Sequence, residues 1–175
     1  NYNIIKNIGV VRVQQAANTG AIIQSNQRYF YIENCYSQYY HNDSGIINGS
    51  GIAGDNISDA VILNCFSVND IVSTHGGIIG SDAGTNGLVI ISNCYSYGDI
   101  FGDNAGGIIG SDGVAVHLAN CYSTGDILGT NAGGIAGNNP NNTRTNFRVK
   151  NCYSNGTPAG FESDFNGVST KINGN

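Results

Sequence analysis

Three aspartates are the residues of this chain whose type and spacing come closest to acid–base chemistry. Asp70, Asp99 and Asp126 each precede an isoleucine, in the tripeptides Asn-Asp-Ile or Gly-Asp-Ile. Two neighbouring carboxylates can cleave a glycosidic bond, so the spacing admits a polysaccharide-cleaving site. Stacked like charges about 4.8 Å apart are unfavourable, however, unless N–H groups or cations compensate them. Because the three residues recur position by position, we expect each to accept hydrogen bonds within its own turn.

The same carboxylates raise the question of a metal site, for which calcium is the ion that oxygen ligands favour. Residues 76–82 follow the pattern Gly-Gly-x-x-Gly-x-Asp, one residue away from the nonapeptide repeat that binds calcium in parallel β-helices. The repeat length of the chain does not fit the nonapeptide period. We therefore expect no cofactor and no metal, with calcium as the alternative.

Five cysteines suggest disulfides or a metal site, but their spacing favours neither. There is no Cys-x-x-Cys pair, and whole repeats separate Cys35, Cys65, Cys94, Cys121 and Cys152. Stacked thiols would be close enough for a disulfide, but their side-chain vectors would be parallel and their number is odd. We expect small, buried, reduced thiols, with one or two disulfides between neighbouring coils as the alternative.

The histidines give no support for nucleophilic catalysis. His41, His75 and His117 fall at three different phases of the repeat, so the sequence places none of them beside a particular serine. A catalyst needs one asymmetric set of residues, whereas nearly every polar feature of this chain recurs. The sequence therefore predicts no catalytic residues.

The element that must position all these residues is a repeat of 27 to 31 residues. The tetrad Asn-Cys-aromatic-Ser occurs five times, in steps of 30, 29, 27 and 31 residues. Its asparagines are Asn34, Asn64, Asn93, Asn120 and Asn151, and its aromatic residues are Tyr36, Phe66, Tyr95, Tyr122 and Tyr153. A second block, Gly-Gly-Ile-Ile-Gly or a variant of it, carries Ile52, Ile78, Ile108 and Ile135. Apolar and polar residues alternate before each tetrad, which is the pattern of a half-buried strand.

This period predicts an all-β fold, a right-handed parallel β-helix (β-solenoid) of about five coils with three short strands per coil. Coil stacking turns each repeated position into a ladder of like residues. The repeats cover residues 20–160. Residues 1–19 are expected to be an N-terminal cap or atypical partial coil, and 161–175 a C-terminal partial coil or the start of a further repeat. Since the chain lacks methionine, we expect it to belong to a longer repeat protein.

Two of the ladders have predicted structural or contact roles. We expect the tetrad asparagines to form an amide ladder at a corner, because a stacked amide can donate and accept along its column. The aromatic residues have the opposite parity to the cysteines and are expected to face outward, where they could stack on sugars or on another solenoid. The alternative is that the rings lie beneath a neighbouring loop or pack over the corner.

Charge and hydropathy argue against a nucleic-acid partner and against a membrane-spanning segment. The net charge is −5 and no Lys or Arg occurs between Tyr29 and Thr143, so a nucleic-acid partner is not expected. No run approaches eighteen apolar residues, so no membrane span is predicted. Glycosylation sequons, which matter only in a glycosylating compartment, occur at Asn42, Asn48, Asn56, Asn141 and Asn155.

The tetrad and its neighbouring blocks also carry a resemblance to a known family. The pattern Asn-Cys-Tyr-Ser-x-Gly-Asp-Ile, a short turn and Gly-Gly-Ile-[Ile/Ala]-Gly resembles the GLUG-motif repeat over residues 20–160, most strongly over 64–137. Proteins with such repeats include large bacterial surface and secreted proteins and repeat proteins of giant DNA viruses. The resemblance implies a structural module that is extracellular, on a cell surface or on a virion surface.

We therefore expect a non-catalytic structural, adhesive or surface-display module that contacts copies of itself, other surface or structural proteins, or glycans. The alternative is a module that binds or cleaves polysaccharide. Such an enzyme needs a break in the repeat that gathers carboxylates and a base into a groove, and only residues 39–44 come near one. A self-assembling filament subunit is a third class, favoured because the end coils expose strand edges.

Overall fold

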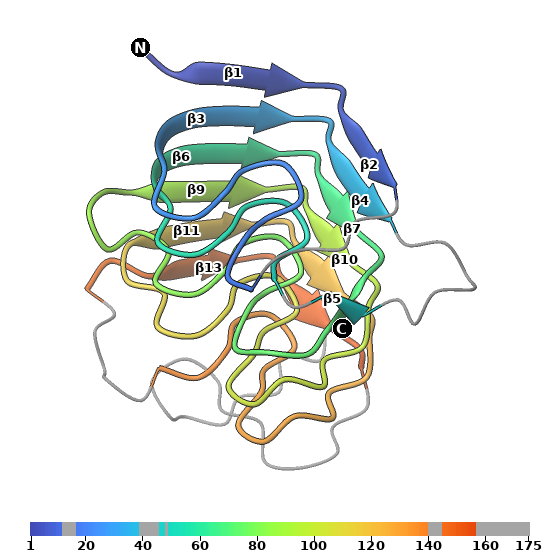
Figure 1. Ribbon diagram of the computed structural model, residues 1–175. Helices are drawn as coiled ribbons and strands as arrows, with labels where there is room; N and C mark the ends of the chain where they lie inside the picture. Colours follow the sequence, from blue (N-terminus) through green and yellow to red (C-terminus); the bar gives the residue numbers. More distant parts are fainter. Residues whose placement is uncertain (12–16, 39–45, 48, 140–144, 157–175) are drawn as a thin grey trace.

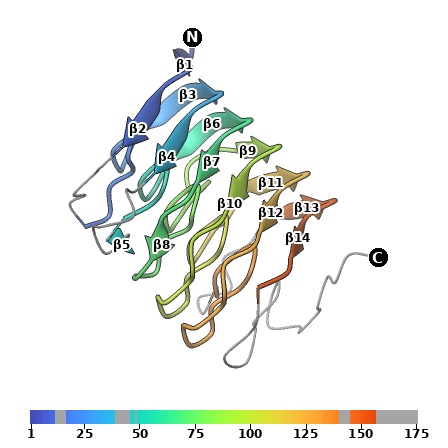
Figure 2. The ribbon, with the colours of Figure 1, turned by 90° about the vertical axis from the view of Figure 1, so that its right-hand side faces the viewer.

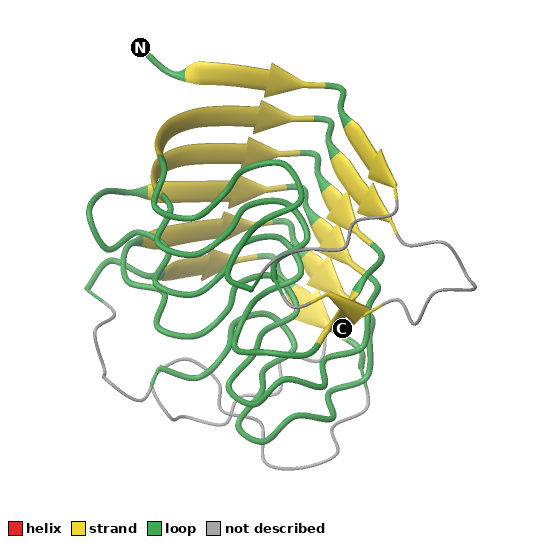
Figure 3. Ribbon diagram, in the orientation of Figure 1, coloured by secondary structure: helices red, strands yellow, loops and turns green. Residues whose placement is uncertain are grey.

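The computed structural model describes residues 1–11, 17–38, 46–47, 49–139 and 145–156, and it confirms the predicted fold class. The chain winds into a β-solenoid of about five turns, with parallel strands in stacked coils (Figure 1). For these residues Figure 3 shows strands and loops, without a helix. The described part of the chain therefore contains no helix that could cross a membrane.

The alternating segment before each tetrad forms the first sheet. Its strands, in spatial order, are β1 (Asn3–Lys6), β3 (Arg28–Glu33), β6 (Ser58–Leu63), β9 (Val89–Ser92), β11 (Val116–Ala119) and β13 (Arg148–Lys150). Equivalent residues of successive coils pair, so Ile32, Ile62 and Ile91 form one fully buried column. Each buried isoleucine stabilises the fold by about 1.5–3 kcal/mol.

The aromatic-Ser half of each tetrad forms the second sheet, which meets the first at the asparagine (Figure 2). Its strands are β2 (Gly9–Val11), β4 (Tyr36–Gln38), β7 (Phe66–Ser67), β10 (Tyr95–Ser96), β12 (Tyr122–Ser123) and β14 (Tyr153–Ser154). Residues 3–11 are thus a coil in register with the next one, with Lys6 opposite Glu33 and Gly9 opposite Tyr36. This coil has Ile8 where the tetrads have cysteine, so the motif did not reveal it.

The remaining sides of the coil carry little regular strand. The Asp-Ile segment is paired in β5 (Ile46–Ile47) and β8 (Asp70–Ile71) and continues as single bridges from Ile71 to Ile100 and Ile127. In the Gly-Ile block two consecutive N–H groups donate to one carbonyl of the next coil, as those of Ile78 and Ile79 do to Ile108. This pair of hydrogen bonds to a single carbonyl oxygen bends the chain, so the block forms a corner rather than a strand.

Small residues let opposite walls of the coil approach each other. The interior holds two apolar clusters, a large one behind the first sheet and a small one around Ile71, Ile100 and Ile127. The tetrad serine packs against the second glycine of the Gly-Gly pair, where a Cβ on Gly77 would collide with Ser96. Glycine permits this close approach because it has no Cβ. The contact recurs in four coils and explains why serine ends each tetrad.

Candidate functional site

The tetrad asparagines form a continuous amide ladder. Together with Asn7 of the first coil, they define what we call the tetrad corner: Asn7, Asn34, Asn64, Asn93, Asn120 and Asn151. All six have a left-handed backbone, with φ between 52° and 58°, which asparagine tolerates better than most residues. Each Nδ2 donates to the Oδ1 of the preceding coil over 3.2–3.3 Å. Each interior asparagine therefore both donates through its Nδ2 and accepts through its Oδ1, and the ladder holds the corners of successive coils together.

The five cysteines stack as a column of buried free thiols next to this ladder. Each sulfur lies 3.1–3.4 Å from the carbonyl oxygen two residues before it. Burial raises the pKa of the Cys94 thiol, so the protonated form is favoured there. Hydrogen bonds with Cys94 and Cys152 instead lower the pKa values of Cys65 and Cys121. All five sulfurs are buried, however, so the column packs the interior and is closed to reagents in solution.

The aromatic residues of the tetrads stack face to face along the solenoid axis. Successive ring centroids lie 5.0–5.3 Å apart, and the ring planes differ by 4–10°. Tyr97 meets Tyr95 and Tyr122 edge-on, and its hydroxyl lies 3.1 Å from that of Tyr122. This contact is the main cause that raises the pKa of Tyr122. The rings cover one another's faces, so those inside the column expose only their edges. They therefore provide no flat surface on which a sugar ring could stack.

The predicted aspartate column exists, but its bonds run between coils rather than within a turn. Oδ1 of Asp70 accepts the N–H of Asp99 over 2.8 Å, and Oδ1 of Asp99 accepts the N–H of Asp126 over 2.8 Å. Burial raises the pKa of Asp70, and the neighbouring charge of Asp99 adds to this effect. The difference arises because stacking of the coils places a backbone N–H of the next coil within hydrogen-bond distance of Asp70 and of Asp99. The column thus joins coils.

The sequons differ in their surroundings. Asn56 uses its Nδ2 to bond Asn26 Oδ1 at 2.8 Å, and Ser58 of the same sequon is buried, so this site is closed to a glycosylating enzyme. Asn155 is exposed on the last described coil. The other three sequons, at Asn42, Asn48 and Asn141, lie outside the described residues, as do the 39–44 segment, His41 and residues 161–175.

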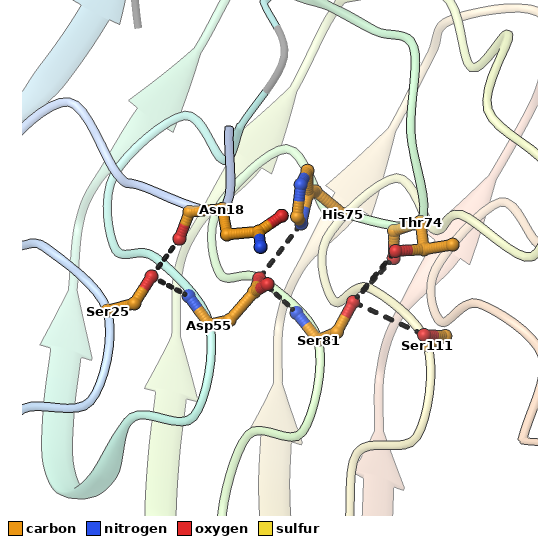
Figure 4. Close-up of polar contacts among 7 residues, drawn as sticks. All are labelled: Asn18, Ser25, Asp55, Thr74, His75, Ser81 and Ser111. Carbon is orange, nitrogen blue, oxygen red and sulfur yellow. Dashed lines mark hydrogen bonds and ion pairs between the residues drawn. The ribbon is translucent and has the colours of Figure 1, made fainter. Parts of the chain in front are cut away.

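One polar cluster does not recur, and the sequence analysis missed it. His75 is 1% exposed, and its Nδ1 lies 2.8 Å from Oδ1 of Asp55. The same oxygen accepts the N–H of Ser81 over 2.8 Å, while the N–H of Asp55 donates to Oγ of Ser25 over 3.0 Å (Figure 4). The available signal was a substitution: His75 stands one residue before a bridged glycine, where later coils have alanine.

The cluster combines a serine, a histidine and an aspartate, but not in a catalytic geometry. The Ser81 hydroxyl donates to the Thr74 carbonyl over 2.9 Å and accepts from Ser111 at 3.2 Å, as Figure 4 shows. It is therefore bonded away from the imidazole, and the buried His75 ring is closed to a substrate. What the arrangement does is tie the corners of neighbouring coils together.

A shallow hollow of about 370 Å³ adjoins this cluster. Its lining consists of Asn, Asp, Ser and Thr side chains, among them Asn26, Asn56, Asp55 and Asp82. Within the described residues no group of three His, Cys, Asp or Glu side chains is arranged to hold a metal ion. The hollow is therefore a polar surface of hydrogen-bonding groups.

Comparisons with known proteins give no relative from which a function could be transferred. No family model, no curated protein and no solved structure matches this chain significantly.

Proposed function

We propose that this chain is a non-catalytic structural module of a repeat protein, which works by presenting a long, uniform surface. The observation that carries the proposal is that the recurring polar side chains bond to the neighbouring coil: the tetrad asparagines to one another, and Asp70 and Asp99 to backbone N–H groups. Groups occupied in this way hold coils together and are not poised for chemistry.

The surface beside the aromatic stack is the contact region that we favour. Val68 and Tyr97 follow their tetrads on the outward side and are 37% and 46% exposed, and Tyr153 at the end of the stack is 43% exposed. Exposed apolar side chains at equivalent positions of two neighbouring coils suit weak contacts with a partner that repeats along the same axis. A second copy of this solenoid, or another structural layer, has that periodicity.

The resemblance to GLUG-motif repeats suggests where such a module works. We propose an extracellular location, on a cell or virion surface, in a longer repeat protein. This part of the proposal depends on the motif Asn-Cys-Tyr-Ser-x-Gly-Asp-Ile and its companion Gly-Gly-Ile block. Immunogold labelling of intact cells or virions from the source would test it, and label confined to the cell interior would refute it.

Sedimentation velocity over a range of concentrations tests the contact surface. The wild type is expected to self-associate, and the double variant Val68→Ser with Tyr97→Ser to sediment as a monomer. Ile90→Ser is the matched control, because Ile90 is 37% exposed on the outer side of the first sheet. Equal association of both variants would refute this surface. Turnover of a polysaccharide with a defined pH optimum would refute the non-catalytic function.

Glycan binding is the second candidate, favoured by the polar hollow rather than by the aromatic stack. Hydroxyl, amide and carboxylate groups of the kind that line the hollow can bond sugar hydroxyls. An NMR titration with oligosaccharides distinguishes the two surfaces. Shifts at Asn18, Asn26 and Thr85 would support glycan binding in the hollow, and an unchanged spectrum with every oligosaccharide would exclude it.

A further inference from the structure

A second corner of the solenoid repeats the backbone geometry of the tetrad corner. Its residues, which we call the second corner, are Asn26, Asn56, Asp82 and Asp112, with φ of 60°, 53°, 56° and 54°. Each of their N–H groups donates to a carbonyl of the following coil over 2.8–3.1 Å. The four residues are therefore successive rungs of one column, and the Asn26 and Asn56 side chains face each other as those of the tetrad corner do.

The side-chain ladder of the second corner stops after one rung. Asn56 Nδ2 donates to Asn26 Oδ1 over 2.8 Å, in the same direction as the tetrad ladder. Asn56 Oδ1 is buried and accepts no hydrogen bond from any described residue. The rung that should donate to it is Asp82, and an ionised carboxylate has only acceptors. The column therefore lacks one hydrogen-bond donor at this point. The missing donor costs stability, because a buried oxygen without a hydrogen bond is unfavourable.

Negative charge surrounds Asp82. The carboxylates of Asp112 on the next rung and Asp55 across the hollow both act on it, and burial is the largest cause that raises its pKa above the ordinary 3.8. His75 is bonded to Asp55, and Arg28, the cation of this region, pairs with Asp59 at 2.5 Å. Among the described residues that line the hollow there is no Lys or Arg.

We propose that Asp82 is a proton-binding rung. In mildly acidic solution its carboxyl group takes up one proton, and the resulting O–H group donates a hydrogen bond to Asn56 Oδ1. The O–H group supplies the missing donor, and the loss of one charge relieves the repulsion from Asp112 and Asp55. Because the folded state binds this proton more tightly than the unfolded chain, its stabilisation is complete below pH 3.8 and is lost as the pH rises through the higher folded-state pKa. Protonation of this one carboxyl group therefore adds stability on acidification.

Asp82→Asn tests the proposal, because an amide supplies the missing donor permanently. At pH 7 this variant is expected to melt about 2–4 °C above the wild type, the shift that one hydrogen bond gives a protein of this size. The gain should shrink as the pH falls toward 4. Asp103→Asn is the matched control: it removes the same charge outside this column and keeps the acceptor for the Thr130 N–H, so it should keep the pH slope of the wild type.

Direct titration gives an independent check. The Asp82 carboxyl carbon, followed by NMR, should titrate above pH 3.8, and Asp112→Asn should lower that pKa because it removes a neighbouring negative charge that raises it. An Asp82 titration midpoint at or below pH 3.8 would overturn the proposal. Equal melting temperatures of Asp82→Asn and Asp103→Asn at pH 7 would also overturn it. So would a melting temperature that rises with added calcium in the wild type and not in Asp82→Asn, since a cation would then occupy the place of the proton.

Discussion

The tetrad corner and the second corner have one backbone conformation and two kinds of side-chain column. Both place residues at φ near 55° and bond each N–H to the next coil. The tetrad corner has asparagine on every rung and an unbroken ladder, whereas the second corner changes to aspartate at Asp82 and its ladder stops at Asn56. Either residue satisfies the backbone, since both tolerate left-handed φ. Only an amide satisfies the column, because it both donates and accepts.

The difference extends to what lies beside each corner. The tetrad corner adjoins the cysteine column and the stacked rings, which recur in every later coil. The second corner adjoins the Asp55–His75 pair and the polar hollow, which occur once in the part of the chain that the structure describes. A regular corner can be extended from coil to coil with one set of contacts, and an irregular one must be stabilised by particular partners. The following predictions test this contrast.

Thiol reactivity should show the largest effect, on the tetrad side. The native protein should react with a thiol reagent about 1000-fold more slowly than the denatured protein, since the sulfurs are reached only after opening that costs about 4 kcal/mol. Denaturation without reductant should release five thiols, as expected for five free cysteines. Rapid reaction of the native protein, or release of fewer than two thiols, would contradict the packed column.

Asn93→Ala should destabilise the tetrad corner by about 2–4 kcal/mol. Alanine disfavours φ of 54°, and its side chain can neither donate to Asn64 nor accept from Asn120. Urea unfolding at pH 7 measures the change. Asn93→Gly keeps the left-handed backbone and loses only the ladder, so it should cost about half as much. Equal stability of Asn93→Ala and the wild type would show that the ladder does not hold the corner.

His75→Ala should cost about 2 kcal/mol on the irregular side, because Asp55 loses a hydrogen bond and a buried ring leaves a void. The substitution creates the residue that later coils carry at this position, so the backbone should tolerate it. Asp55→Asn keeps the acceptor for the Ser81 N–H and should cost less. Thermal unfolding followed by circular dichroism checks both. A more stable His75→Ala would mean that the pair is retained for another reason.

Tyr95→Ser should cost about 1–2 kcal/mol, since the ring loses stacked contacts with both Phe66 and Tyr122 at 5.0 Å. Tyr95→Phe keeps the stack and is expected to be nearly neutral. Chemical denaturation of the two variants separates the ring from its hydroxyl. If both lose the same stability, the hydroxyl rather than the stacking matters.

Asp70→Asn should give the smallest change, a gain of less than about 1 kcal/mol at pH 7, because the group is partly solvated. The amide keeps an acceptor for the Asp99 N–H and removes a charge whose burial raises its pKa. As with Asp82, the gain should vanish below pH 3.8, where the wild-type carboxyl is neutral in both states. A loss of stability at pH 7 would mean that the charge strengthens the bond between coils.

Repetition made the regular part of this protein predictable. A tetrad recurring every 27 to 31 residues requires one coil per repeat, so the parallel β-solenoid and the stacking of like residues follow from spacing alone. The residues of the amide ladder and the thiol column could be named on this basis. When each repeat forms one coil, equivalent residues of successive repeats must lie next to each other. The first coil was expected only as a cap or an atypical partial coil, since Asn7 is followed by isoleucine and the motif is absent there.

Features that occur once, or that depend on orientation, were decided only by the tertiary structure. Spacing placed the aromatic residues on one outward column, but whether rings offer faces or edges depends on their side-chain torsions, and stacking at 5.0 Å covers the faces. Asp55 and His75 are 20 residues apart and share no motif, so only the path of the coil brings their side chains together. The sequence thus determined which residues stack, because the repeat period fixes the register. The fold alone determined which unrepeated residues meet, because their contacts depend on the course of each corner in space.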